Sequence, residues 1–229
     1  VLDEEFIQAE LDKRKPGSAH AGLAGTTRKE ADRVKFLSGV YEGKTTGTPL
    51  AFFVENSNQK SGDYVKLAYT YRPGHADRAY DEKYGFRDPR GGGRSSARET
   101  IARVVGGAVA QLYLKEHGIN VVAYTEAIDG IYANNFGAFS LDACEKRLFF
   151  APNEEVIPHW QERIEEVRNN LDTLGGIVSI EAHGVPAGLG EPVFQKLDAC
   201  LSYALMSVGA VKAVEIGAGT KAATSRGSQ

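Results

Sequence analysis

Residues 71–103 gather the side chains best suited to bind anions and to move protons. This stretch holds eight basic and five acidic residues, whereas the whole chain of 229 residues carries a formal net charge of −3. A local excess of arginine in an acidic chain indicates a pocket for a small anion. A nucleic-acid interface needs many phosphate contacts spread over a basic face, so nucleic acid is a poor candidate for a partner.

A histidine stands in a turn near the start of this stretch. His75 follows the turn-forming pair Pro73-Gly74 within residues 72–77 (RPGHAD), so we expect it on a loop. Histidine exchanges protons near neutral pH, and Asp77 is close enough in sequence to bias its charge state. A single loop histidine is more often only solvent-exposed, but the arginines that follow favour a functional role.

A glycine-rich entry to a helix comes next. Residues 91–93 (GGG) precede Arg94, and the spacing of Ser96 and Glu99 predicts a capping box in which the serine oxygen accepts from the backbone N–H of Glu99. A helix that ends near Gly118 is predicted by the apolar residues Ile101, Val104, Val105, Ala108 and Leu112. Its N-terminus would suit a phosphate; the alternative is a well-capped, solvated helix start.

Several long motifs, in order along the chain, resemble chorismate synthase. The resemblance is carried by residues 72–77 (RPGHAD), 83–85 (KYG) and 91–100 (GGGRSSARET), and by four further segments: 11–17, 37–49, 184–194 and 204–217. It implies an α+β fold with helices sandwiched between antiparallel sheets, forming a single core over residues 1–229. It also implies a lyase that converts 5-enolpyruvylshikimate 3-phosphate to chorismate and phosphate by anti-1,4-elimination, the last step of the shikimate pathway. Reduced FMN is required without net redox change.

The resemblance also assigns roles to residues. His75 corresponds to one of the family's two catalytic histidines. The residues expected to contact FMN are Arg94, Ser95, Ser96, Gly209 and Ala210. The residues expected to bind substrate are Arg14, His20, Arg72, Arg98 and Arg103, although many relatives have arginine where this chain has His20. NADPH as flavin reductant and a homotetramer are further expectations for a full-length member.

Family members begin with a segment that holds the other catalytic histidine and end with segments that complete the flavin and substrate sites. Neither end has a counterpart here. We therefore expect a fragment that is incomplete at both ends and inactive alone, with a non-catalytic flavin- or anion-binding fragment as the alternative.

Composition indicates where the protein is located and in what state its cysteines are. No apolar run approaches the roughly 20 residues needed to cross a bilayer, so we expect a cytoplasmic protein with no membrane contact. Cys144 and Cys200 lie far apart without metal-ligand spacing, so we expect two buried free thiols and no metal site.

Periodicity predicts three pairings of a helix with a following strand. The helices are those near residues 101–112, 160–171 and 197–208, and the strands are 119–123, 177–182 and 211–216. An opening helix should end before residues 16–17, and strands at 34–41 and 49–54 should be joined by a turn. Neither Gly43-Lys44-Thr45 nor Gly188-Leu189-Gly190 has the spacing of a nucleotide-binding motif.

Overall fold

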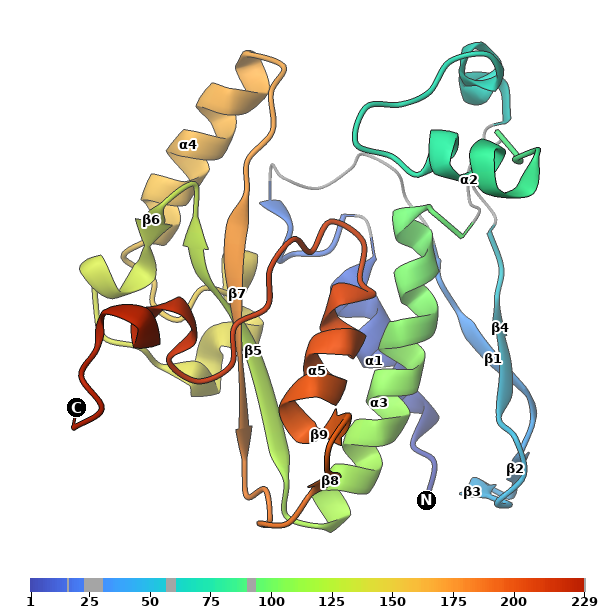
Figure 1. The fold of residues 1–229 in the computed structure, drawn as a ribbon. Coiled ribbons are helices and arrows are strands. Elements are labelled where there is room, and N and C mark those ends of the chain that lie inside the picture. Colours follow the sequence, from blue (N-terminus) through green and yellow to red (C-terminus); the bar gives the residue numbers. More distant parts are fainter. Residues whose placement is uncertain (16, 23–30, 57–60, 90–93, 229) are drawn as a thin grey trace. The chain divides into compact units, whose positions relative to one another are not determined.

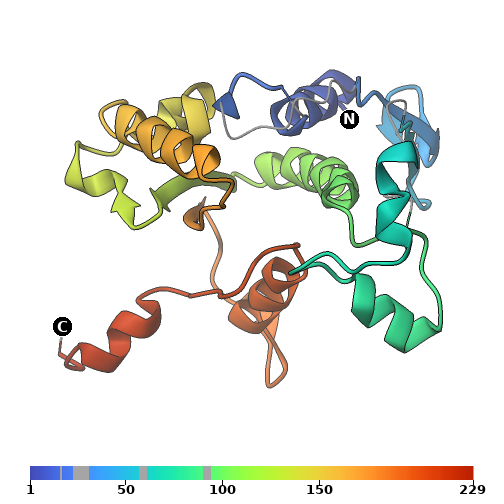
Figure 2. The same cartoon turned by 90° about the horizontal axis from the view of Figure 1, so that it is seen from above.

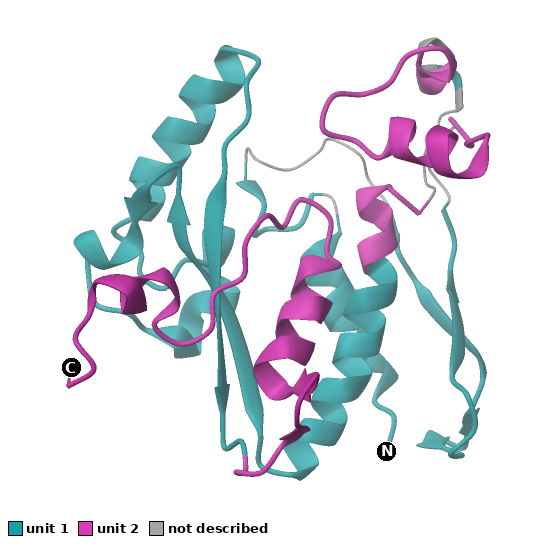
Figure 3. Cartoon of the chain, in the orientation of Figure 1, with its two compact units in different colours: residues 1–63, 101–185 teal, residues 64–100, 186–229 magenta. Residues whose placement is uncertain are grey.

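A computed structural model describes residues 1–15, 17–22, 31–56, 61–89 and 94–228 (Figure 1). Contacts group the chain into two compact units (Figure 3). Unit 1 comprises Val1–Asp63 and Ile101–Val185, and unit 2 comprises Tyr64–Thr100 and Pro186–Gln229. Every pair of neighbouring strands in the described residues is antiparallel, which with the helices gives the predicted α+β class.

Helix α1 (Glu4–Arg14) opens unit 1. It begins where Asp3 Oδ1 accepts a hydrogen bond of 2.9 Å from the backbone N–H of Phe6, which satisfies one of the unpaired donors of the first turn. Acidic residues in its first turn and basic residues in its last turn complement the helix dipole. Its buried face consists of Ile7 and Leu11, and the predicted opening helix is confirmed.

Two small antiparallel sheets of two strands each follow. Strand β1 (Val34–Ser38) pairs with β4 (Ala51–Val54), and β2 (Val40–Tyr41) pairs with β3 (Lys44–Thr45). The β2–β3 hairpin turns at Glu42 and Gly43, whose φ angles are 46° and 70°. Two successive positive φ angles are typical of the tight turns whose twist matches the flanking strands. The predicted turn, expected over residues 43–47, is confirmed at Gly43, but Lys44–Thr45 form strand β3 instead.

Helix α3 (Thr100–Glu116) follows a short 3-10 turn at Ala97–Glu99. Its buried residues pack with α1 into the first core of unit 1: Leu2, Ile7, Leu11, Ile101, Val105 and Ala108. Apolar side chains of β1 and β4 pack against this core, so α1 and α3 lie side by side between the β1–β4 pair and a second sheet (Figures 1 and 2). The predicted sandwich of helices between antiparallel sheets is thus present in unit 1.

The predicted capping box was wrong in detail. Ser96 Oγ accepts from the backbone N–H of Arg98 at 3.2 Å, and the backbone N–H of Glu99 donates to the carbonyl of Ser96 instead. The chain enters the helix through a 3-10 turn, which shortens the spacing between the cap and its donor.

The sheet on the other side of α1 and α3 has three strands in the order β6–β5–β7. They are β5 (Asn120–Ile128), β6 (Ile131–Tyr132) and β7 (Gly176–His183). Helix α4 (Ile157–Asn169) contributes Trp160 to a second core that also contains Ala133, Phe149, Ala151 and Val156. Trp160 is fully buried, and its Nε1 donates to the carbonyl of Ile131 at 2.9 Å. Leu171 does not belong to the apolar face as predicted, because the chain leaves the helix there with a φ of 57° and the side chain is 96% exposed.

Unit 2 contains helix α2 (Asp77–Tyr84), the hairpin of β8 (Gly190–Glu191) with β9 (Gln195–Lys196), and helix α5 (Leu197–Met206). Residues 211–216, all of them described, form no strand, so that prediction was wrong. Alternating side chains are not sufficient for a strand, which also needs a neighbour to accept its backbone hydrogen bonds.

The remaining short 3-10 helices of the two units are Ser61–Tyr64, Lys66–Ala68, Ala133–Asn135, Leu141–Lys146, Leu148–Phe150 and Gly219–Thr224. No helix in the described part of the chain is long and apolar enough to cross a membrane.

Candidate functional site

The carboxylate of Asp77, the first residue of α2, organises the turn that displays His75. Only 4% of its side chain is exposed. Asp77 Oδ2 accepts from Arg72 Nε at 2.8 Å and from the Arg72 backbone N–H at 3.1 Å, and Asp77 Oδ1 accepts from Arg72 Nη2 at 2.8 Å. Parallel bonds between guanidinium and carboxylate are among the strongest ion pairs in proteins. The turn is therefore closed around one buried carboxylate.

His75 also contacts this carboxylate, and we call the group of Arg72, His75, Asp77 and Arg87 the Asp77 cluster. His75 Nδ1 lies 3.0 Å from Asp77 Oδ1 and 3.2 Å from Arg72 Nη2, and its backbone N–H donates to the carbonyl of Arg72 at 3.2 Å. The predicted loop position of His75 is confirmed, and helix α2 begins two residues later, at Asp77. The predicted closeness to Asp77 is confirmed as direct contact.

Arg87 closes the cluster from the far end of α2. Its Nη2 donates to the carbonyls of Leu67 and Thr70, its Nε donates to Asp81 Oδ2 at 3.1 Å, and its Nη1 lies 3.6 Å from Asp77 Oδ1. Only 7% of the side chain is exposed. A buried guanidinium with this many acceptors ties the segment before the turn to α2.

These contacts shift ionisation in the expected directions. The hydrogen bonds from Arg72 hold the pKa of Asp77 well below its ordinary value, against the opposing effect of burial. The same hydrogen bonds raise the pKa of Arg72. Both groups therefore stay charged at neutral pH, and His75 faces a fixed negative charge together with a fixed positive one.

The predicted flavin-contacting residues also lie in unit 2. Arg94 is exposed, and Ser95 and Ser96 are half-buried at the entry to α3. Gly209 and Ala210 form an exposed turn after α5, where Ala210 has a φ of 70° and the space beside Gly209 is open. Residues 91–93, the glycines expected to lead into the phosphate cradle, lie outside the described residues.

The other predicted substrate-binding residues each have separate surroundings. Arg14, His20 and Arg103 belong to unit 1, and Arg98 belongs to unit 2. Arg14 Nη1 lies 3.2 Å from the buried carboxylate of Asp32. His20 stacks on Phe150 with 4.5 Å between ring centroids, and its Nδ1 lies 3.2 Å from the carbonyl of Arg147. Arg103 and, in unit 2, Arg98 are half-buried. Among the predicted site residues, the structure joins Arg72 and His75 through their side chains, and Arg98 and Ser96 through a backbone N–H of Arg98.

The two cysteines differ from each other. Cys144 is a buried free thiol, as predicted, and burial raises its pKa. Cys200 is also free but exposed, so its predicted burial was wrong: it lies on α5, none of whose residues is buried.

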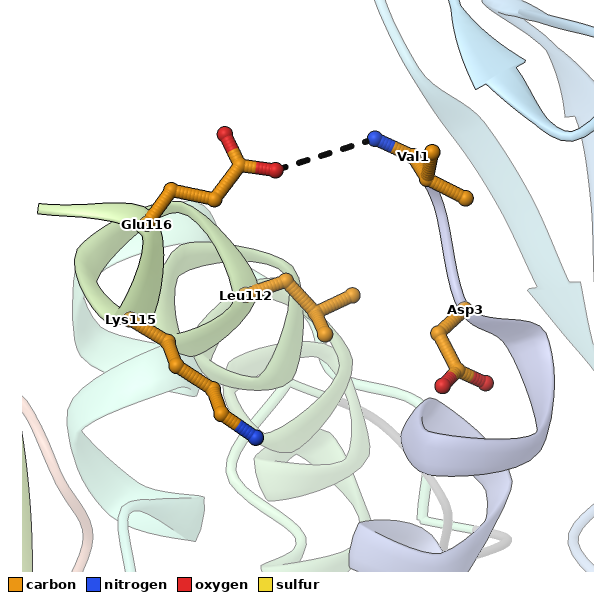
Figure 4. A pocket seen from close by; sticks show the side chains of 5 residues that line it. All are labelled: Val1, Asp3, Leu112, Lys115 and Glu116. Carbon is orange, nitrogen blue, oxygen red and sulfur yellow. Dashed lines mark ion pairs between the residues drawn. The ribbon is translucent and has the colours of Figure 1, made fainter.

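A surface hollow of about 360 Å³ lies at the C-terminal end of α3, away from the predicted site residue on that helix. Figure 4 shows Leu112, Lys115 and Glu116 of α3 facing Val1 and Asp3. The amino group of Val1 lies 3.9 Å from Glu116 Oε1. None of the predicted site residues lines this hollow.

Comparison with known proteins identifies the family. A family model described as chorismate synthase matches residues 1–229. The chain belongs to the chorismate synthase family. It is 60% identical over 228 residues to the chorismate synthases of Nitratidesulfovibrio vulgaris (strain Miyazaki F) and Maridesulfovibrio salexigens, matching 100% of this chain in each case. The chain spans 64% and 63% of the length of these two relatives.

A solved structure titled "Crystal Structure of Chorismate Synthase" has the same fold. The match covers 99% of this chain and 64% of that chain, with a TM-score of 0.79 and 32% sequence identity. The predicted chorismate synthase-like fold is therefore confirmed.

Two members of the Asp77 cluster were underestimated from sequence. Asp77 was expected only to bias the charge of His75, and Arg87 was counted only as part of the local positive charge. The position of Asp77 five residues after Arg72 at a helix start could have suggested a closed turn. Arg87 carried no such signal, because its role depends on carbonyls 17 to 20 residues earlier.

Proposed function

We propose that this chain carries much of the active site of a lyase that converts 5-enolpyruvylshikimate 3-phosphate to chorismate and phosphate, the last step of the shikimate pathway. In this elimination phosphate leaves with its bonding electron pair and hydrogen leaves C6, so that a second ring double bond forms. The observation that carries the proposal is the match of the entire chain to relatives named chorismate synthase at 60% identity. The Asp77 cluster supplies the local chemistry that supports it.

We assign His75 a proton-transfer role. Its Nδ1 faces the Asp77 carboxylate at 3.0 Å, so Nε2 is the nitrogen left to hold or release a proton toward a ligand. One histidine among several arginines adds little to anion affinity, whereas an imidazole can act as a general acid or base. Its removal should therefore slow turnover more than it weakens binding.

The substrate is an anion with one phosphate and two carboxylates, and we assign its recognition to the cationic residues. These are Arg14, Arg72, Arg98 and Arg103, with His20 at a position where arginine is common in relatives. A guanidinium can grip planar or tetrahedral oxyanions through two hydrogen bonds, which supports this use of arginine.

The donor set at the start of α3 fits the phosphate of FMN. A cationic side chain at Arg94 and hydroxyls at Ser95 and Ser96 stand where the chain enters a 17-residue helix, whose dipole places partial positive charge at that end. The open space beside Gly209 would admit a flat ring close to the backbone. When bound, reduced FMN would supply the electron-rich partner that this elimination requires without net redox change.

Three properties of the full-length protein complete the proposal. They are NADPH as a source of electrons for the flavin, assembly as a homotetramer, and a cytoplasmic location. Each rests on resemblance to the family.

The test compares histidine variants in a catalytically active protein that contains this sequence. In anaerobic assays with reduced FMN and 5-enolpyruvylshikimate 3-phosphate, His75→Ala should lower turnover by roughly 10 to 10⁴-fold with little change in substrate affinity. His117→Ala is the matched control, because this exposed histidine lies beside Tyr113 at the other end of α3, with 4.5 Å between ring centroids. Unchanged turnover in His75→Ala would remove this histidine from the mechanism. Flavin binding without any chorismate formation would favour a non-catalytic flavin- or anion-binding module.

A further inference from the structure

The burial of Asp77 requires a physical reason. A carboxylate that is 4% exposed loses most of its hydration, a cost that is offset only by strong partners. Here the partners are Arg72 and His75, the two residues that the proposed function needs at the ligand, together with Arg87 behind them. Besides the backbone N–H of Arg72, the carboxylate thus contacts the side chains of Arg72, His75 and Arg87.

The contacts determine which nitrogen of His75 carries a proton. A carboxylate only accepts hydrogen bonds and a guanidinium only donates them, so Asp77 Oδ1 and Arg72 Nη2 make opposite demands on Nδ1. The carboxylate is the closer of the two, at 3.0 Å against 3.2 Å, and Arg72 Nη2 already donates to Asp77 Oδ1 at 2.8 Å. A bare lone pair on Nδ1 would face the negative oxygen. The network therefore assigns the hydrogen to Nδ1.

The same carboxylate also selects the edge of Arg72 that can meet a ligand. Nε and Nη2 form one side of the guanidinium, and both donate to Asp77 at 2.8 Å. The hydrogens of Nη1, together with the second hydrogen of Nη2, remain at the end of the side chain. Arg72 would thus approach an oxyanion end-on rather than through its Nε side.

We propose that Asp77 is a positioning residue: it holds His75 in the Nδ1–H tautomer with Nε2 presented to the ligand, and it orients Arg72 end-on. The inference deepens the proposed function and rests on it for its catalytic consequence. The charged groups that face His75 are Asp77 from α2 and Arg72 from the preceding turn, while Arg87 reaches Asp77 from beyond α2. The geometric part of the proposal requires no substrate.

The first test is therefore spectroscopic and uses the 229-residue chain. The ¹⁵N chemical shifts of the His75 ring, measured above the pH at which it becomes neutral, distinguish a protonated Nδ1 from a protonated Nε2. We expect the Nδ1–H form to predominate. A predominant Nε2–H form would overturn the proposal without any variant, and this result is independent of whether chorismate is the product.

The second test replaces Asp77 by asparagine, which has the same shape but carries an NH₂ donor. That donor can turn toward His75 and stabilise the opposite tautomer, the change known to impair a catalytic histidine held by aspartate. We expect the ¹⁵N pattern of His75 to shift toward Nε2–H. Turnover in an active protein should fall by about the same factor as for His75→Ala, roughly 10 to 10⁴-fold. Glu82→Gln is the matched control, because Glu82 lies on α2 in an exposed pair with Arg78.

A double variant separates positioning from general damage. If Asp77 acts through His75, adding Asp77→Asn to His75→Ala should lower turnover per bound substrate no further. Independent, multiplying losses would show that Asp77 serves only the fold. If His75→Ala left turnover unchanged while the ¹⁵N tautomer was as expected, the proposed function would fail and the geometric assignment would stand. Should Asp77→Asn not fold, the measurement on the unaltered chain decides.

Discussion

At the scale of single residues, the site depends on one buried carboxylate, that of Asp77, which contacts both Arg72 and His75. A turn before a helix follows from Pro73-Gly74, so the loop position of His75 could be inferred from local conformational preferences. The bidentate pair of Arg72 with Asp77 could not, because it depends on the rotamers of two long side chains. Arg87 was out of reach for a further reason: its Nη2 donates to backbone carbonyls in and just after a separate 3-10 segment, Lys66–Ala68.

The depressed pKa of Asp77 predicts how stability depends on pH. An aspartate in an unfolded chain has a pKa near 3.9, and the folded value lies below it. The stabilisation is therefore fully present above the unfolded pKa and is lost as the pH falls toward the folded one. We expect Asp77→Asn to lower the free energy of unfolding by on the order of 2 kcal/mol at pH 7. Denaturant titrations followed by circular dichroism should show this difference shrinking as the pH falls below about 4, and still shrinking at the lowest pH at which the folded protein can be measured; a constant difference would contradict the linkage.

Arg103 offers a second test at the residue scale. It is half-buried near the start of α3 and outside the buried apolar face. Arg103→Lys keeps the charge but loses the two-pronged donor geometry, so substrate binding should weaken by about 10-fold while FMN binding changes little. Calorimetric titration of each ligand into an active protein provides the measurement. An equal loss of affinity for both ligands would instead assign Arg103 to support of the fold.

At the scale of elements, the spacing of apolar residues predicted the helices correctly, because the backbone hydrogen bonds of a helix have both partners within it. Helices α1, α3, α4 and α5 all form where apolar spacing predicted them. Strands β5 and β7 were predicted too, although β5 runs to Ile128, beyond the alternating residues at its start. The strand expected at residues 211–216 failed because pairing is a property of two segments, and one segment's pattern carries no information about the other.

A close approach of two backbones fixes the ends of α3 and β7. A Cβ atom at Gly184, where φ is 75°, would lie 2.3 Å from the carbonyl oxygen of Gly118. Gly130 has nearly the same φ, 76°, but nothing within 4 Å of such an atom, so it is a matched control. Gly184→Ala should therefore lower the free energy of unfolding by about 1–3 kcal/mol more than Gly130→Ala. If urea denaturation gave the same loss of unfolding free energy for both variants, the backbone near Gly118 would have shifted to accommodate the Cβ atom without destabilising the fold.

At the scale of the whole molecule, the relatives are longer than the region that matches this chain. The chain spans 64% of the length of the first relative, so more than a third of that protein has no counterpart in this alignment. The single core over residues 1–229 stays a prediction, since contacts group the chain into two units and their mutual arrangement is not described.

We expect the 229-residue chain by itself to bind FMN weakly and to form little chorismate. Fixed dipoles and charges act most strongly in a site closed off from water, and relatives carry further chain that can complete such an enclosure. The measurement is an anaerobic assay with reduced FMN and 5-enolpyruvylshikimate 3-phosphate. Turnover equal to that of a full-length relative would show that the matched region suffices.

The buried indole of Trp160 has a practical consequence. It is the sole tryptophan of the chain, and it lies in the second core of unit 1. Its emission should be blue-shifted in the native state and shift to the red only when that core takes up water. Unit 2 contains tyrosines but no tryptophan. Exciting the indole alone therefore reports the opening of unit 1, while circular dichroism reports both units, and the gap between the two curves measures how independently they unfold.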